Sequence, residues 1–172
     1  MGKKIYLGSD HAGFKLKRKI ERWLHKKNMP YEDLGNITYD PEDDYPDFAE
    51  LVARKSVDEK SFGILICGSA QGVCIAANKI KGARAVIPSS KKETILARLH
   101  NDANILCLSG WKTGWIKAIS LIKAFLTTPF SSEERHKRRL NKIKSLEEGK
   151  TILKEDKSNS MLKKRMVKQE EI

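Results

Sequence analysis

The stretch from Phe62 to Gly72 constrains the fold more than any other part of the chain. It contains the apolar, partly β-branched run Ile64-Leu65-Ile66, which is typical of a parallel strand buried on both faces. The run stops at Cys67-Gly68-Ser69, and the residues from Gln71 to Lys79 are predicted to form a helix that ends before Gly82. A glycine-containing turn between a strand and a helix gathers free backbone N–H groups at the positive end of the helix, so this turn predicts an anion-binding site.

Cys67 is the chemically distinctive side chain of this turn, because it stands at the carboxyl end of the predicted strand, where open α/β sheets bind ligands. The turn lacks the Gly-Lys-Ser/Thr of a Walker loop and the Gly-x-Gly-x-x-Gly of a dinucleotide site. A thiol at a helix N-terminus can have a lowered pKa, yet free cysteine is also among the most buried residue types. The local pattern therefore leaves a reactive and an inert Cys67 open, whereas Cys74 and Cys107 are predicted to be inert core thiols.

Strand and helix patterns alternate along the rest of the chain. Predicted strands cover 5–7, 30–34, 64–66, 83–87 and 104–108. Predicted helices cover 14–26, 46–58, 71–79, a segment capped by Ser89 or Ser90 and running to Leu99, and 115–126. This alternation predicts a Rossmann-like three-layer α/β/α sandwich with a five-stranded parallel sheet, and a further basic segment at 131–146 predicts an extra C-terminal helix.

The length of 172 residues fits one domain with an appended tail, and we place these at 1–148 and 149–172. The second segment is basic and mostly polar, so it is expected to be a frayed tail or a marginal helix.

The overall charge and the cysteine content bear on partners and location. The net charge of +12 raises nucleic acid as a partner, but the excess is spread along the chain without a recognised nucleic-acid motif. Nucleic acid is therefore an unlikely partner, and phosphorylated small molecules account for the charge as well. No apolar run approaches the length of a membrane span, which predicts no membrane association. Three cysteines without framework spacing, and a start that does not resemble a signal peptide, predict a cytoplasmic protein.

Other candidate groups lie at both ends of the predicted strands. Asp10 and His11 follow the first strand, so the sheet can bring them to the same rim as Cys67. His100 precedes the fifth strand and therefore lies at the opposite rim of the same subunit, unless a second subunit brings its own His100 across an interface. His136 lies in a basic cluster and is either a surface charge or an anion ligand.

Five sequence blocks, in order along residues 4 to about 143, resemble the sugar-phosphate isomerase family that contains ribose-5-phosphate isomerase B and the galactose-6-phosphate isomerase subunits. The blocks are Gly8-Ser9-Asp10-His11-Ala12-Gly13-Phe14, Asp44-Tyr45-Pro46-Asp47, Ile66-Cys67-Gly68-Ser69, Ile75-Ala76-Ala77-Asn78-Lys79 and His100-Asn101-Asp102-Ala103-Asn104.

The resemblance implies an aldose–ketose isomerase that interconverts ribose 5-phosphate and ribulose 5-phosphate through an enediolate, with no metal ion and no cofactor. It implies that Cys67 is the base, that Ser69 supplies a hydroxyl and that His100 opens the furanose ring. It further implies a homodimer, possibly a tetramer, in which two subunits share each site. The residues that it implies for substrate binding are Asp10, His11, Tyr45, Gly68, Ala70, Gln71, Gly72, Asn101, Lys112, Arg135, His136 and Arg139.

Three positions depart from the family pattern. Ser69 replaces a threonine, Ala70-Gln71-Gly72 replaces Gly-x-Gly and places a bulkier side chain beside the anion site, and Lys112 replaces an arginine. Lysine keeps the positive charge but loses the bidentate fork for phosphate. Three alternatives stay open: an isomerase of allose or galactose 6-phosphate, a non-catalytic sugar-phosphate-binding protein and a basic nucleic-acid-binding module.

Overall fold

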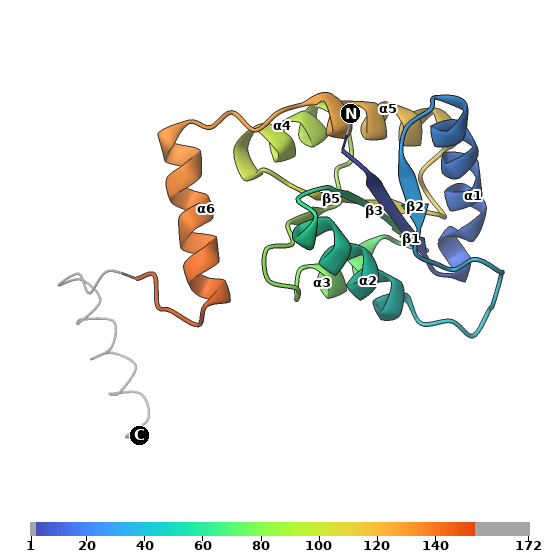
Figure 1. Ribbon diagram of the computed structural model, residues 1–172, viewed down its shortest axis with the longest axis horizontal. Coiled ribbons are helices and arrows are strands. Elements are labelled where there is room, and N and C mark those ends of the chain that lie inside the picture. The colour runs from blue at the N-terminus through green and yellow to red at the C-terminus, as the bar shows by residue number, and fades with distance from the viewer. Residues whose placement is uncertain (1–2, 154–172) are drawn as a thin grey trace, which may run out of the picture.

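The computed structural model of the chain describes residues 3–153 and contains a single sheet (Figure 1). The strands are β1 (Ile5–Ser9), β2 (Tyr31–Asp33), β3 (Phe62–Cys67), β4 (Ala85–Val86) and β5 (Ile105–Ser109). The helices are α1 (His11–Lys26), α2 (Tyr45–Asp58), α3 (Gln71–Ala77), α4 (Lys91–Asn101), α5 (Trp115–Thr127) and α6 (Glu134–Glu147).

The five strands pair in the order β2-β1-β3-β5-β4, and every pairing is parallel. The strand Ile64–Ile66 predicted from the apolar run lies inside β3 at the centre of the sheet, where all three side chains are buried. In the pairing of β3 with β5, Cys67 stands opposite Ser109. Because all strands run in one direction, the residues that follow β1, β3 and β5 meet at one edge of the sheet. We call this the carboxyl edge and the other the amino edge.

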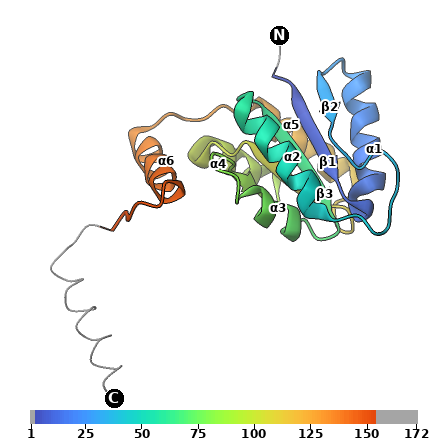
Figure 2. The ribbon, with the colours of Figure 1, turned by 60° about the horizontal axis from the view of Figure 1, so that its bottom comes forward.

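Helices cover both faces of the sheet (Figures 1 and 2). One face carries α1, α4 and α5, whose apolar side chains form a core cluster with alternate residues of the strands, including Leu16, Ile20 and Phe125. The other face carries α2 and α3, and its cluster contains Val52, Val73 and the thiol-bearing residues Cys67 and Cys107. The predicted three-layer α/β/α architecture is therefore confirmed.

The predicted extra helix is present as α6, which stands beside α4 and away from the three layers (Figure 1). It is joined to the body at both ends. Ser131 N–H donates to the Leu99 carbonyl over 3.1 Å, and Gly82 N–H donates to Glu147 Oε1, also over 3.1 Å. Most of the predicted tail at 149–172 falls outside the described residues. Among residues 3–153, none of the helices has the length and apolar character needed to cross a bilayer.

Several predicted boundaries were wrong, and local hydrogen bonds explain why. Helix α1 begins at His11 and not at Phe14, because the Asp10 side chain accepts from Gly13 N–H over 2.9 Å and caps the helix. Helix α3 ends at Ala77, two residues before Lys79, and the following Asn78 side chain donates to the Ala85 carbonyl over 2.9 Å.

Candidate active site

Cys67 is the last residue of β3 and stands at the carboxyl edge, as predicted. Hydrogen bonds tie the chain that follows β3 to the chain that follows β5. Gly110 N–H donates to the Cys67 carbonyl over 2.8 Å, and Ser109 Oγ donates to the Gly68 carbonyl over 2.6 Å. The thiol-bearing residue is only 4% exposed. Cys67 is thus held in a fixed place by two neighbouring strand ends.

The turn after Cys67 is built on a left-handed residue. Ala70 has φ of +74°, a conformation that costs an L-residue about 1–2 kcal/mol. Its methyl group is fully buried in the same core cluster as Val73. Ser69 and Gln71 are exposed, and Gln71 N–H donates to Ser69 Oγ over 3.3 Å. The extra bulk of Ala70 is therefore accommodated in the core, while Gln71 is the side chain that stands free at the turn.

Two aromatic rings lie directly against the glycines of this turn. A Cβ atom placed on Gly68 would lie 2.5 Å from Cζ2 of Trp111, and one placed on Gly72 would lie 2.7 Å from Cε2 of Tyr45. Both rings are accessible, since Trp111 is 73% and Tyr45 is 40% exposed. Any residue larger than glycine at these two positions would displace the ring. Trp111 and Tyr45, the second of which was predicted to bind substrate, therefore line the turn that follows Cys67.

The turn between β1 and α1 reaches the same edge. Asp10 N–H donates to the Ile66 carbonyl over 3.3 Å, which places Asp10 and His11 next to the end of β3. Asp10 is 6% exposed, and burial raises the pKa of its carboxyl group. His11 Nδ1 lies 2.7 Å from Oδ1 of Asp43, and this hydrogen bond raises the pKa of the imidazole. The predicted pair Asp10 and His11 is therefore brought together with Cys67.

Sequence reasoning missed Asp43. Its carboxylate accepts from both the backbone N–H and the ring of His11, over a separation of 32 residues along the chain. The only available signal was a run of three acidic residues, Glu42-Asp43-Asp44, just before Tyr45. Lys112, which was predicted to bind phosphate, follows β5 at this edge and is exposed.

The remaining predicted residues gather at the amino edge. His100 and Asn101 are the last two residues of α4, so the helix runs two residues past its predicted end at Leu99. The His100 ring lies 4.3 Å, centroid to centroid, from the ring of His136 on α6. Arg135 and Arg139 are exposed on the same helix. Within one chain the structure thus forms two groups of candidate residues, at opposite edges of the sheet.

His136 was predicted to be either a surface charge or an anion ligand, and the first alternative is wrong because the residue is only 1% exposed. Its Nδ1 atom lies 2.7 Å from Oγ of Ser131, and burial lowers the pKa of the imidazole. The residue therefore packs as a neutral ring against His100. No sequence pattern within the basic cluster marked this position as buried.

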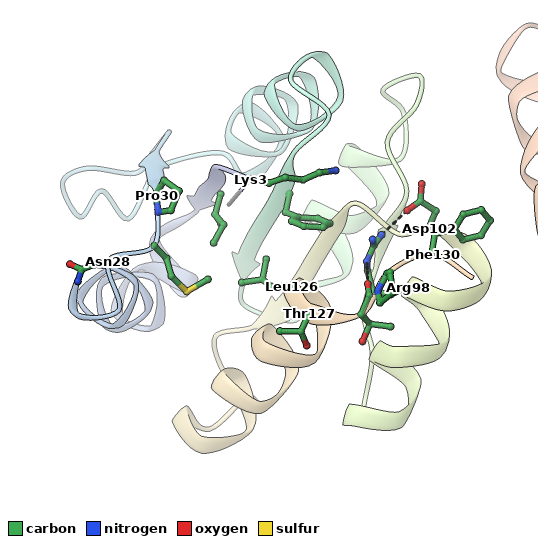
Figure 3. A pocket seen from close by; sticks show the side chains of 13 residues that line it. Lys3, Asn28, Pro30, Arg98, Asp102, Leu126, Thr127 and Phe130 are labelled. Carbon is green, nitrogen blue, oxygen red and sulfur yellow. Dashed lines mark hydrogen bonds and ion pairs between the residues drawn. The ribbon is translucent and has the colours of Figure 1, made fainter. Parts of the chain in front are cut away.

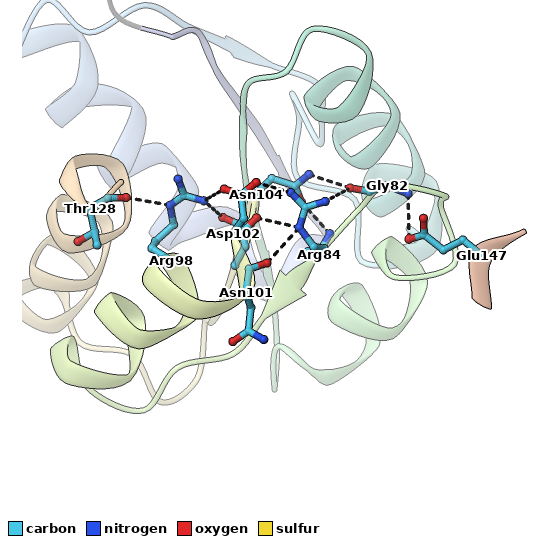
Figure 4. A network of polar contacts seen from close by, with 9 residues as sticks. Gly82, Arg84, Arg98, Asn101, Asp102, Asn104, Thr128 and Glu147 are labelled. Carbon is cyan, nitrogen blue, oxygen red and sulfur yellow. Dashed lines mark hydrogen bonds and ion pairs between the residues drawn. The ribbon is translucent and has the colours of Figure 1, made fainter. Parts of the chain in front are cut away.

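A polar network fixes the end of α4 that carries His100 and Asn101 (Figure 4). Asp102, in a left-handed conformation at the helix C-cap, pairs with Arg98 Nη1 through Oδ1 and with Arg84 Nη2 through Oδ2, each over 2.8 Å. Arg84 Nε also donates to the Asn101 carbonyl over 3.1 Å, and Arg98 Nε donates to the Thr128 carbonyl over 3.1 Å. The helix end is held rigidly, which suits a side chain that must be presented in one orientation.

A cavity of about 690 Å³ opens at the amino edge, between the ends of α4 and α5 and the start of the sheet (Figure 3). Its walls include Lys3, Phe62, Arg98 and Leu126, and it contains none of the predicted site residues. Helices run antiparallel to the strands here, so their negative C-terminal ends face this edge. Arg98 donates hydrogen bonds to the carbonyl groups of Thr128 and Ala103 there. The cavity therefore lies apart from the chemistry at Cys67.

Comparison with known proteins gives a clear family match. Residues 5–143 match the family model described as Ribose/Galactose Isomerase. The probable ribose-5-phosphate isomerase B of Mycoplasma genitalium is 45% identical over 141 residues, which cover 81% of this chain and 92% of that protein. The ribose-5-phosphate isomerase B of Mycobacterium leprae is 40% identical over 147 residues, which cover 85% and 91%.

Solved structures give the same result. The crystal structure of the Mycoplasma genitalium ribose-5-phosphate isomerase B with bound ribulose-5-phosphate aligns with a TM-score of 0.80 at 44% identity, covering 84% of this chain and 96% of that one. The type B ribose 5-phosphate isomerase of Trypanosoma cruzi aligns with a TM-score of 0.82 at 37% identity, covering 87% and 99%. The chain belongs to the ribose/galactose isomerase family.

Proposed function

We propose that this chain interconverts ribose 5-phosphate and ribulose 5-phosphate, with Cys67 as the proton-transferring base. The observation that carries the proposal is the position of Cys67 at the carboxyl end of β3, between the turn from Gly68 to Gly72 and the pair Asp10 and His11. The relatives named above support the choice of pentose, since one of them was solved with ribulose 5-phosphate bound.

The proposed reaction moves one proton between two carbon atoms. The Cys67 thiolate removes the proton from C2 of the open-chain aldose, and the electron pair flows toward the C1 carbonyl to form an enediolate. Backbone N–H groups of the turn stabilise the negative charge on oxygen, where preorganised donors are most effective. The exposed hydroxyl of Ser69 assists proton exchange between O1 and O2. Return of the proton from Cys67 to C1 then gives the ketose.

Ring opening must precede this step for the cyclic aldose, and we assign it to His100. His100 lies at the opposite edge of the sheet from Cys67 in the same chain, so it must come from a second subunit. The packing of His136 on the His100 ring supports a role for His136 in orienting this group. We therefore propose a homodimer with two equivalent shared sites, the commonest form of homo-oligomer.

The phosphate group would meet positive charge from both subunits. Lys112 lies at the carboxyl edge with Cys67. Arg135 and Arg139 are exposed on α6, so the subunit that supplies His100 also supplies these two arginines. Asn101, adjacent to His100 at the end of α4, is placed to hydrogen-bond the sugar. The three free cysteines of the described residues suit a reducing compartment, so we place the enzyme in the cytoplasm.

Mixing two inactive variants tests both the chemistry and the shared site. Cys67→Ser replaces the base with a hydroxyl that stays protonated at neutral pH, and His100→Asn removes the ring-opening group. Each variant alone should be inactive on ribose 5-phosphate. After mild dissociation and mixing, half the dimers are mixed and each holds one intact site of two, so about a quarter of wild-type activity should return.

Each result of the mixing experiment has a clear meaning. No recovery, with mixed dimers demonstrated by native mass spectrometry, would refute the shared site. Near wild-type turnover by Cys67→Ser would refute the assignment of the base. Assays of the wild type with allose 6-phosphate and galactose 6-phosphate complete the test. Faster turnover of either hexose phosphate would identify it, and not the pentose phosphate, as the preferred substrate. Absence of turnover with all three would favour a non-catalytic binding protein.

A further inference from the structure

In the loop before α2, both carboxylate oxygens of Asp43 accept hydrogen bonds. Oδ1 of Asp43 accepts from the His11 backbone N–H over 2.9 Å and lies 2.7 Å from His11 Nδ1. Oδ2 accepts from Nδ2 of Asn36 over 2.6 Å. The Asp43 side chain is only 6% exposed, whereas that of His11 is 37% exposed. One side of the His11 ring is therefore fixed by a buried group, and the other side reaches the surface of the proposed site.

The residue that holds Asp43 is itself anchored. Asn36 N–H donates to the Ser9 carbonyl at the end of β1 over 2.9 Å. The Asn36 carbonyl accepts from Nζ of Lys17 over 2.7 Å, and this fully buried ammonium group also pairs with Asp33 over 2.5 Å. A chain of hydrogen bonds thus runs from α1 and β1 through the loop to the His11 ring. Such a chain keeps the Asp43 carboxylate in one place.

Three negative groups surround the His11 imidazole. Asp43 forms the hydrogen bond, Asp10 is the residue before it at the N-cap of α1, and Glu42 lies on the loop. All three favour the charged ring, while partial burial and the positive end of α1 oppose it. Of the three, Asp43 alone combines charge with direct contact to the ring, and its hydrogen bond is the largest cause of the raised pKa of His11.

We propose that Asp43 is a positioning residue that orients His11 and keeps a proton on its Nδ1 atom, so that Nε2 is the ring nitrogen presented to the substrate. The inference rests on the proposed function, in which His11 contacts the sugar phosphate. With the ring charged, Nε2–H donates a hydrogen bond to a substrate oxygen. With the ring neutral, Nδ1 keeps its proton for Asp43 and Nε2 becomes an acceptor. Binding of an oxyanion is therefore strongest below the pKa of His11 and weakens as the pH rises through it.

The test compares three variants with the wild type. Asp43→Asn removes the charge but keeps an oxygen that can accept from His11. Asp43→Asn combined with Asn36→Asp exchanges the two side chains, so the hydrogen bond between them is preserved while the charge moves one residue further from the ring. Glu42→Gln is the matched control, because it removes a negative charge from the same loop without touching His11.

The primary measurement is the pKa of His11, determined by NMR titration of the imidazole C–H signals. The chain has four histidines, and a His11→Asn variant identifies the signal. In Asp43→Asn and in the exchanged variant the pKa should fall by about 1–3 pH units, the range expected for loss of an adjacent opposite charge. In Glu42→Gln it should fall by less than about half a pH unit, since the charge is not in contact with the ring.

The second measurement is KM for ribulose 5-phosphate between pH 6 and 9. The pH at which KM begins to rise should be lower in Asp43→Asn and the exchanged variant, by the same amount as the pKa of His11. A residue with only a structural role would raise KM equally at every pH and leave this midpoint unchanged.

An unchanged His11 pKa in the exchanged variant would overturn the proposal, and so would a shifted pKa with an unshifted KM profile. If Asp43→Asn fails to fold, the exchanged variant still decides. If the wild type does not turn over ribulose 5-phosphate, the proposed function fails, yet the NMR titration still measures whether Asp43 controls the proton on His11.

Discussion

Replacing Gly13 with alanine should disable the enzyme while leaving the protein folded. Gly13 lies in the first turn of α1, two residues after His11, and packs on the backbone of Ile66 at the end of β3. A Cβ atom at this position would lie 2.4 Å from the Ile66 carbonyl oxygen and 2.7 Å from its carbonyl carbon. Backbone atoms cannot change rotamer, so the only relief is a movement of α1 away from β3.

The size of that movement follows from the contact distance. Ordinary van der Waals contact begins at 3.4 Å, so the start of α1 must move by about 1 Å from the strand that carries Cys67. Crowding of this kind costs about 1–3 kcal/mol. Alanine, however, stabilises a helix by about 1 kcal/mol relative to glycine. The free energy of unfolding should therefore fall by only about 0–2 kcal/mol. A misplacement of about 1 Å between catalytic groups can lower activity by about 100-fold.

The assay is kcat/KM for ribulose 5-phosphate together with urea unfolding. Gly114→Ala is the matched control, because Gly114 has φ of −64° and a Cβ atom there meets nothing within 4 Å. The control should keep wild-type kcat/KM. A folded Gly13→Ala protein with near wild-type kcat/KM would refute the reasoning, since it would show that the distance between α1 and β3 does not limit the reaction.

Two further predictions concern stability. Lys17→Met should lower the free energy of unfolding by about 1–3 kcal/mol, because it removes the ammonium partner of the half-buried Asp33 carboxylate. Adding Asp33→Asn should recover part of this loss. Urea unfolding of both variants measures it, and an unchanged midpoint in Lys17→Met would contradict it. Burial lowers the pKa of His136 in the folded protein, so the unfolded chain binds the proton more readily and stability should fall as the pH drops below about 6.5. A His136→Gln variant should lose that part of the pH dependence in urea midpoints measured at pH 7.5 and 5.5, and identical dependence in both proteins would count against it.

Much of the fold could be predicted because it depends on strong local patterns. The run Ile64–Ile66 is fully buried at the centre of the sheet, and such a run has few alternatives to a parallel strand. The start of α1 was missed because Asp10 looks like part of a turn until its side chain is seen to cap Gly13. Turn residues and N-cap residues are chemically the same set, so only the hydrogen bond distinguishes them.

The candidate site was less predictable, because its parts meet only in three dimensions. The family blocks marked Cys67 and His11, but Asp43 contacts His11 from a loop with no regular pattern. The burial of His136 could not be predicted either, since its neighbours along the chain are charged and its partner His100 lies on another helix. Long-range contacts between polar side chains produce no periodic pattern in the sequence, so they cannot be inferred from it.

In the proposed homodimer, helix α6 would make the protein sensitive to dilution. Of its 14 residues, His136 alone is buried, and a helix of this length is only marginally stable when isolated in water. In a lone chain α6 should open locally long before the sheet unfolds, and its amide hydrogens should exchange with solvent almost without protection. A second subunit that covers the helix would stabilise its folded form by mass action. Ordering of the residues that carry the two arginines and association of the chains would then be a single equilibrium, set by protein concentration.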